Sequence, residues 1–154
     1  MNATAAPQDA VLVERLEGVI QLTLNAPKNR NSLQSPGIYE GLMAGFDALE
    51  QDSSLRAAVI TGAGGAFCSG GDLRQLAKRR ELPVEERRAK LEGLHDLIRT
   101  VRDCRKPVIA AVEGAAAGAG LSLALACDML VAARNAVFSV AYVKVGLTPD
   151  GGAT

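Results

Sequence analysis

The feature that most constrains the fold is a pattern that occurs twice: an apolar run, a stretch of glycine and other small residues, and a helix-like segment. The first copy spans 57–79 and the second 108–127. In both copies the apolar run, AAVITG (57–62) or PVIAAVEG (107–114), is short and predicts a strand buried on both faces. Repetition of strand, glycine-rich exit and helix predicts an α/β fold.

The small residues in these exits indicate that the main chain itself has a task. The first exit continues as AFCSGGDL (66–73) and the second as AAAGAG (115–120). Glycines in such numbers cost backbone entropy, which is tolerated where another group must approach the bare backbone. Free N–H groups at the start of a helix carry partial positive charge. If the two exits converge, they form a site for negative charge.

The remaining segments complete one domain over 11–154, after a loose tail at 1–10. Alternating apolar residues predict a hairpin from strands 11–16 and 19–25. Apolar positions at helical spacing predict helices over 36–51 and 84–104, and the small-residue segment 115–127 is also expected to be a helix. Two further strands are expected, MLVAA (129–133) and VFSV (137–140). The basic run 78–80 is expected to face solvent, in a mobile segment near the mouth of a pocket.

Composition excludes several classes of function. The 154 residues are 48% hydrophobic and 22% charged, which fits one globular domain, and 17 basic residues balance 17 acidic ones without a dense basic block, so nucleic acid is not expected as a partner. Three cysteines at unrelated spacings and a single histidine support neither a disulfide framework nor a metal site, and they fit the reducing cytoplasm. The longest uncharged stretch is too short for a membrane span, and the N-terminus lacks the features of a signal peptide.

Five segments in order resemble the crotonase, or enoyl-CoA hydratase/isomerase, superfamily: NAPKNRNSL (25–33), AFCSGGDL (66–73), KPVIAAVEGAAAGAG (106–120), LACDMLVA (125–132) and VGLTPDGG (145–152). The resemblance implies a spiral of ββα units that binds acyl-CoA thioesters, with CoA as part of the substrate and no other cofactor. It also implies homo-oligomers, trimers or hexamers, and a C-terminal helical region that this sequence lacks, as a truncated chain would.

In that family two backbone N–H groups hold the negative charge that develops on the thioester oxygen. Carried over to this sequence, the donors are Gly71 and Ala119. Preorganised amides stabilise such charge without side-chain reorganisation. Ala119 stands where the family usually has glycine, and its N–H serves equally well if the local dihedrals suit a residue with a side chain.

The resemblance also places the contacts to CoA in two turns. Each cation taken singly has the alternative role of a solvated surface charge, and Asp72 also suits the N-terminus of a helix. The expected CoA-contacting residues are Lys28, Arg30, Ser69, Asp72, Leu73 and Arg74.

The acid and base positions depart from those of hydratases. The two hydratase glutamates fall on Ser122 and Tyr142, and neither residue is a useful general base near neutral pH, so simple hydration is disfavoured. Asp150 falls where dienoyl-CoA isomerases, ring-epoxide isomerases and chlorobenzoyl-CoA dehalogenases carry their essential aspartate. One carboxylate suffices for a 1,3-proton shift, because it removes the proton and returns it to another carbon.

Each of these residues has a purely structural alternative. Pro-Asp-Gly is an ordinary turn sequence, Tyr142 could donate a hydrogen bond or form a pocket wall, and Ser122 is interpreted as a packing residue. His95 resembles a histidine of the dehalogenase site, with a half-buried place on a helix face as the alternative.

The function predicted from the sequence is an acyl-CoA isomerase with Asp150 as proton shuttle. The alternatives are an aromatic acyl-CoA hydrolase or dehalogenase, with Asp150 as nucleophile and His95 assisting, an atypical enoyl-CoA hydratase, and a noncatalytic acyl-CoA-binding subunit.

Overall fold

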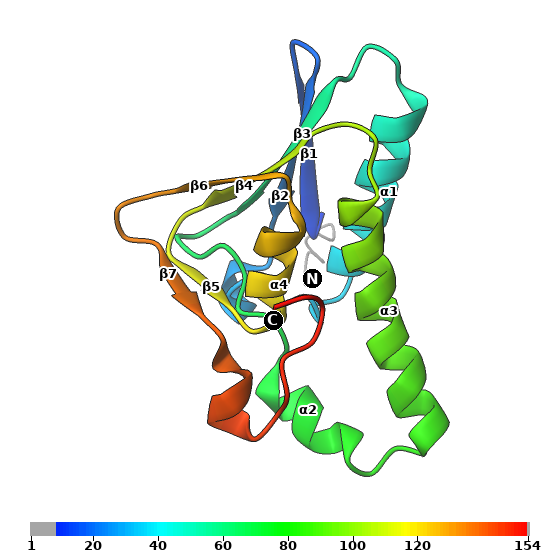
Figure 1. Ribbon diagram of the computed structural model, residues 1–154, viewed down its shortest axis with the longest axis vertical. Coiled ribbons are helices and arrows are strands. Elements are labelled where there is room, and N and C mark those ends of the chain that lie inside the picture. Colours follow the sequence, from blue (N-terminus) through cyan, green and yellow to red (C-terminus); the bar gives the residue numbers. More distant parts are fainter. Residues whose placement is uncertain (1–8, 154) are drawn as a thin grey trace, which may run out of the picture.

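The computed structural model describes residues 9–153, and its centre is a five-stranded sheet in the order β1-β2-β3-β4-β6 (Figure 1). β1 (Val11–Leu16) and β2 (Val19–Leu24) form the predicted antiparallel hairpin. β3 (Ala57–Gly62), β4 (Val108–Val112) and β6 (Met129–Ala132) then add in parallel. The parallel strands carry the chain repeatedly to the same edge of the sheet, where the glycine-rich exits begin.

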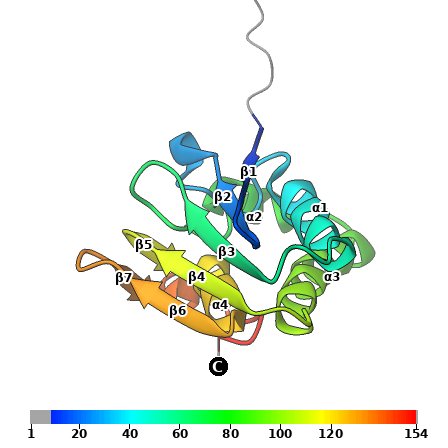
Figure 2. The same ribbon diagram turned by 90° about the horizontal axis from the view of Figure 1, so that it is seen from above.

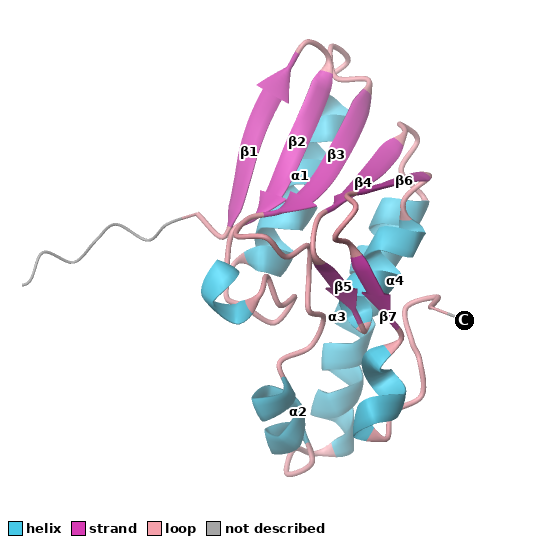
Figure 3. Ribbon diagram, turned by 90° about the vertical axis from the view of Figure 1, so that its left-hand side faces the viewer, coloured by secondary structure: helices cyan, strands magenta, loops and turns pink. Residues whose placement is uncertain are grey.

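A second, smaller sheet lies below that edge. It pairs β5 (Ala115–Ala117) with β7 (Val137–Ser139) in parallel, and Cys68 forms a single parallel bridge to Ala116 (Figure 3). Each turn of the chain therefore passes through a strand of the large sheet, a short strand or bridge of the small one, and a helix or helical turn. This is the predicted spiral of ββα units.

The prediction of one helix over 115–127 is wrong at its start. Residues 115–117 are strand β5, and α4 (Ala119–Ala126) begins only after Gly118. The Cys68 N–H donates to the Ala115 carbonyl at 3.0 Å, and the Ala117 N–H donates to the Cys68 carbonyl at 2.9 Å. These sheet hydrogen bonds outweigh the helix propensity of three alanines, which is only a weak preference.

The other helices agree with the sequence to within two residues at each end. They are α1 (Ile38–Gln51), α2 (Leu73–Arg79) and α3 (Val84–Arg102), with 3₁₀ turns η1 (Pro27–Asn29) and η2 (Ala141–Val145). α1 and α3 lie side by side, as Figures 1 and 2 both show. Within residues 9–153, none of the helices has the length and apolar character needed to cross a bilayer.

The core lies between the large sheet and these helices. Leu22, Ile60 and Ala110 from neighbouring strands are fully buried in the same cluster as Leu42 and Phe46 of α1. The prediction that 57–62 is buried on both faces is only half right, because its residues alternate between buried and half-buried. α1 lies behind the large sheet in Figure 3, so the near face remains partly open.

Part of the predicted loose tail is ordered by the hairpin. Asn25 donates from its backbone N–H to the Ala10 carbonyl at 2.7 Å and from its side chain to the Asp9 carbonyl at 3.0 Å. The prediction of a tail over 1–10 is therefore wrong for Asp9 and Ala10, and the rest of it lies outside the described residues.

Asn31 connects the 25–31 turn to the first exit. It is fully buried with φ of 53°, its side-chain N–H₂ donates to the carbonyls of Ala63 and Ala66 at 2.9 and 2.7 Å, and its Oδ1 accepts from the Ala26 N–H at 2.9 Å. Asparagine suits this position because it tolerates left-handed backbone and fills all three hydrogen bonds.

Asn31→Ala is expected to lower the free energy of unfolding by about 2–4 kcal/mol, because it leaves three partly buried backbone groups unpaired. Urea denaturation measures this loss. Asn29→Ala in the same turn is the control and should change stability by less than about 0.5 kcal/mol, since Asn29 is exposed. Equal effects of the two substitutions would contradict the role assigned to Asn31.

Candidate active site

The two glycine-rich exits meet with backbone against backbone. A Cβ added to Gly70 would lie 2.6 Å from the Ala117 carbonyl oxygen and 2.7 Å from the Ala119 nitrogen, and one added to Gly120 would lie 2.2 Å from the Cys68 carbonyl oxygen. No side chain fits at either place, so glycine is required for the contact. The convergence that the sequence left conditional is therefore present.

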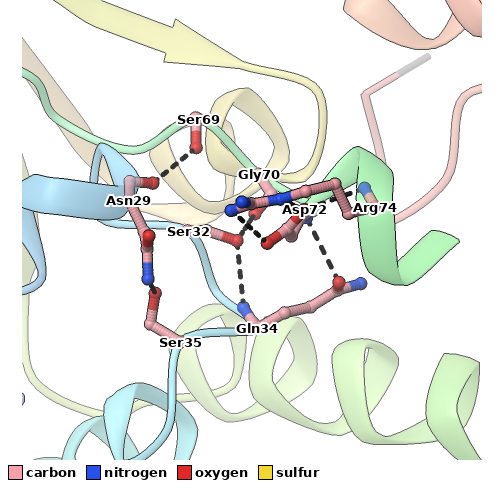
Figure 4. Close-up of polar contacts among 8 residues, drawn as sticks. All are labelled: Asn29, Ser32, Gln34, Ser35, Ser69, Gly70, Asp72 and Arg74. Carbon is pink, nitrogen blue, oxygen red and sulfur yellow. Dashed lines mark hydrogen bonds and ion pairs between the residues drawn. The ribbon is translucent and has the colours of Figure 1, made fainter.

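The orientation of the Gly71 N–H is fixed by its own peptide unit. The Gly70 carbonyl accepts a hydrogen bond from the Ser32 hydroxyl at 2.7 Å (Figure 4). It accepts another from the Leu33 N–H at 3.0 Å. The peptide is trans, so the N–H of Gly71 points away from that carbonyl. The Gly71 N–H therefore also points away from the 32–33 turn, and Gly71 lines a cavity.

The same arrangement orients the Ala119 N–H. The preceding carbonyl, that of Gly118, accepts from the N–H groups of Leu121 and Ser122 at 2.9 and 3.1 Å, so the Ala119 N–H points outward from the first turn of α4. Ala119 is not among the residues with positive φ, so its methyl group causes no backbone strain. Among the described residues, neither the Gly71 nor the Ala119 N–H has an acceptor.

A cavity of about 470 Å³ opens in front of these two amides. Its wall is mostly apolar, and its polar members include Gln34, Arg79, Tyr142 and Asp150. Helices α2 and α3 and the η2 turn contribute most of the leucines and valines: Leu73, Leu76, Leu91, Leu94, Leu97 and Val145. An apolar cavity with a few convergent polar groups is typical of a small-molecule site.

Asp150 enters this cavity bound to Tyr142. The Tyr142 hydroxyl donates to Asp150 Oδ1 at 2.6 Å, and it lies 3.0 Å from the hydroxyl of Ser122. The Ser122 hydroxyl in turn donates to the backbone carbonyl of Asp150 at 2.9 Å. Tyr142 and Ser122, at the positions of the two hydratase glutamates, therefore both contact the one aspartate that the sequence singled out.

Burial raises the pKa of Tyr142 well above its ordinary value, and the hydrogen bond to the Asp150 carboxylate raises it further. Only 6% of Tyr142 is exposed. The phenol therefore remains protonated at neutral pH and acts as a hydrogen-bond donor to Asp150, not as a base. Within residues 9–153 this is the only hydrogen bond to the Asp150 carboxylate, and its Oδ2 accepts none.

Arg79 lines the cavity, whereas the sequence placed its basic run only near a pocket mouth. The basic run 78–80 was expected to face solvent, yet Arg79 is half-buried and lines the cavity. Burial lowers the pKa of its guanidinium, and the negative charge of Asp150 opposes that shift. The sequence does not distinguish three consecutive basic residues from one another. Only one of them, Arg79, lies on the side of α2 that lines the cavity.

The structure separates other predicted residues from the cavity. His95 does not line it; the side chain is half-buried, and its Nδ1 lies 3.8 Å from the Glu92 carboxylate three residues earlier on α3. Lys28 and Arg30 are exposed in the 25–31 turn, which is held against the first exit by a hydrogen bond from the Ser69 N–H to the Arg30 carbonyl at 3.0 Å.

The remaining predicted CoA contacts cluster at the start of α2. Ser69 and Leu73 line the cavity. Asp72 caps α2 by accepting from the Arg74 N–H at 2.8 Å, and it forms an ion pair with the exposed Arg74 side chain at 3.3 Å (Figure 4). Asp72 is thus confirmed as a helix cap, while Arg74 is open to solvent and to a charged ligand.

The thiols of Cys68 and Cys127 are expected to make the protein less stable at alkaline pH. Burial raises the pKa of Cys68 and that of Cys127 from 9.0 to about 12. Between pH 9 and pH 12 the thiols of the unfolded chain lose protons that the folded chain retains. The free energy of unfolding should therefore fall as pH rises above 9, by up to about 1.4 kcal/mol per pH unit for each thiol. Denaturation at pH 8, 9 and 10 measures the slope, and Cys127→Ala should reduce it; an unchanged slope would contradict this assignment.

Comparisons with known proteins agree with this geometry. Residues 14–154 match the family model described as enoyl-CoA hydratase/isomerase. The chain belongs to the enoyl-CoA hydratase/isomerase family, as the resemblance to crotonases predicted. It is 42% identical over 149 residues to a probable enoyl-CoA hydratase, EchA14, of Mycobacterium tuberculosis, covering 97% of this chain and 57% of that protein.

Two further matches show both reaction names within the family. The chain is 40% identical over 139 residues to a 1,2-epoxyphenylacetyl-CoA isomerase of Escherichia coli, covering 90% of this chain and 53% of the isomerase. A crystal structure of an enoyl-CoA hydratase from Polaromonas sp. JS666 superposes with a TM-score of 0.87 at 48% identity, covering 92% of this chain and 55% of that one. The chain thus spans about half the length of the relatives it matches.

Proposed function

We propose that this chain carries the catalytic groups of an acyl-CoA isomerase that shifts a double bond, or isomerises a ring substrate, through a thioester enolate. The observation that supports this most strongly is the Asp150 carboxylate. It lines the same cavity as the two free amides, and its Oδ2 is left without a hydrogen-bond partner among the described residues.

The proposed reaction needs one base and one site for negative charge. Asp150 removes a proton from a carbon conjugated to the thioester, and the electron pair moves through the double bond to the thioester oxygen. The N–H groups of Gly71 and Ala119 bind the enolate oxygen. Asp150, now protonated, returns the same proton to a different carbon, and the electron pair re-forms the carbonyl and a shifted double bond.

Tyr142 supports this assignment over hydration. Its hydroxyl stays protonated and holds one oxygen of Asp150, so the other oxygen is available for the substrate proton. A hydratase needs one group to activate water and another to protonate carbon, and the residues at the two hydratase positions are Ser122 and Tyr142. Several relatives are named hydratases, so hydration is the outcome against which isomerisation is tested.

Lys28, Arg30 and Arg74 are proposed to bind the phosphates of CoA. All three are exposed, and the turns that carry them are joined by hydrogen bonds between 29–33 and 69–70. The acyl group would then enter the apolar cavity behind them.

The proposal is tested by incubating the purified protein with unsaturated acyl-CoA thioesters in deuterated water. A one-base shift transfers the substrate's own proton, so the expected product is a double-bond isomer with little deuterium. Addition of water to the double bond without isomerisation would overturn the proposal in favour of an atypical hydratase. In a parallel single turnover in oxygen-18 water, solvent oxygen appearing in the Asp150 carboxylate would support the hydrolase or dehalogenase alternative.

A further inference from the structure

Ser122 is buried behind the cavity and is not explained by the proposed reaction. It is 1% exposed and does not line the cavity, so it does not reach the substrate. The sequence favoured a packing role for it. Yet its hydroxyl lies within 3.0 Å of both the Tyr142 hydroxyl and the Asp150 carbonyl, which is more than a packing residue requires.

The backbone and side chain of Ser122 act on two different parts of the site. Its N–H donates to the Gly118 carbonyl at 3.1 Å, in the peptide unit whose N–H is that of Ala119. Its hydroxyl donates to the Asp150 carbonyl, which also accepts from the Ala153 N–H at 3.2 Å. One residue is therefore hydrogen-bonded both to the amide that binds the thioester oxygen and to the loop that carries the base.

The loop approaches Ser122 closely enough for this contact to set its position. Gly151 has φ of 57°, and a Cβ added there would lie 3.0 Å from the Ser122 Cβ and 3.4 Å from Ile98. The main chain of the loop thus rests directly on α4 and α3. Glycine at 151 permits both the left-handed backbone and the close approach.

We propose that Ser122 is a positioning residue that fixes the Asp150 carboxylate relative to the Ala119 N–H. Because the reaction requires the base and the oxyanion donors at the same substrate, their separation controls the rate. Displacement of a reacting group by about 1 Å costs on the order of 100-fold in rate. This inference rests on the proposed isomerase for its kinetic consequence, but the position of the loop is testable without a reaction.

The first test measures hydrogen–deuterium exchange of the 147–153 loop in the purified protein. Ser122→Ala is expected to speed exchange at Leu147 and Ala153, whose N–H groups are bonded to the Tyr142 and Asp150 carbonyls. Ser122→Cys, which fills the same space with a weak donor, serves if the alanine variant does not fold. Thr100→Ala is the control, because it also removes a hydroxyl bonded to a carbonyl, that of Asp96 at 2.9 Å, away from the cavity.

The second test measures isomerisation by the same variants. Ser122→Ala should lower kcat by about 10- to 100-fold while KM for the thioester stays within about twofold, because the oxyanion amides and cavity wall are retained. Solvent deuterium in the product should rise, since a displaced Asp150 returns fewer of the original protons. Ser122→Thr should restore most of kcat.

The outcomes separate this inference from the proposed function. Loop exchange and kcat that remain at the wild-type level in both Ser122→Ala and Ser122→Cys would overturn the positioning role. Faster exchange throughout the chain, with loss of binding, would also overturn it in favour of a packing role. If the wild-type protein isomerises no thioester, the proposed function fails, while local loop exchange still decides whether Ser122 positions Asp150.

Discussion

Asp150→Asn is expected to lower kcat for isomerisation by about 10²- to 10⁴-fold, the range over which a positioned general base contributes. The amide has the same shape and still accepts a hydrogen bond from Tyr142, whose hydroxyl is 2.6 Å from Oδ1. It has no basic oxygen that accepts a proton from carbon. The loss should therefore appear in kcat and not in binding of the thioester.

Binding and turnover are measured separately for this variant. Calorimetry with a saturated acyl-CoA gives the dissociation constant, which should change by less than about threefold, because the apolar wall and the two amides are unaltered. Asp96→Asn, which removes a carboxylate on the exposed side of α3, is the control for loss of charge. Turnover by Asp150→Asn near the wild-type rate would remove Asp150 from the mechanism and return Pro-Asp-Gly to its role as a turn.

Ala119→Pro is expected to lower kcat by about 10²- to 10³-fold, the usual cost of deleting one oxyanion donor. Proline has no N–H, and Ala119 is the first residue of α4, the helical position at which proline is best tolerated. Gly118 has φ of 51° and ψ of −127°, outside the helical region that a following proline disfavours. The helix should therefore form while one donor is missing.

Ala119→Gly is the matched control. It keeps the N–H and should leave kcat nearly unchanged, with a loss of stability of no more than about 1 kcal/mol. Circular dichroism verifies that α4 forms in both variants. Equal kcat for the proline and glycine variants would show that the Ala119 amide does not bind the reacting oxygen.

The sequence predicts the fold well where periodic patterns are long. The hairpin, α1, α3 and the strands of the large sheet follow from alternation and from helical spacing. β5 was mistaken for helix because Ala115–Ala117 has no local strand signal: its conformation is imposed by Cys68, nearly fifty residues earlier. Such non-local hydrogen bonds are invisible to a pattern read along the chain.

The candidate site could be predicted only in part, because motifs are visible in the sequence and contacts between distant segments are not. Gly71, Ala119 and Asp150 were predicted from motifs that match a family position by position, and all three line the same cavity. The contacts that give Asp150 its setting were not, since they join Ser122, Tyr142 and the 147–153 loop across the fold. His95 was a candidate because its position resembles that of a histidine in the dehalogenase site, but it is not among the residues that line the cavity.

The bridge between Cys68 and Ala116 limits how this site can change. Its main-chain hydrogen bonds fasten the turn that carries the first proposed oxyanion donor to the turn that carries the second. These hydrogen bonds therefore set the distance between the two proposed donors, and surface side chains do not contribute to it. In the proposed mechanism the acid or base comes from two other places, the 141–153 segment and position 122 of α4. Exchanging both between relatives should therefore exchange reactions, while recognition of the thioester oxygen stays in place.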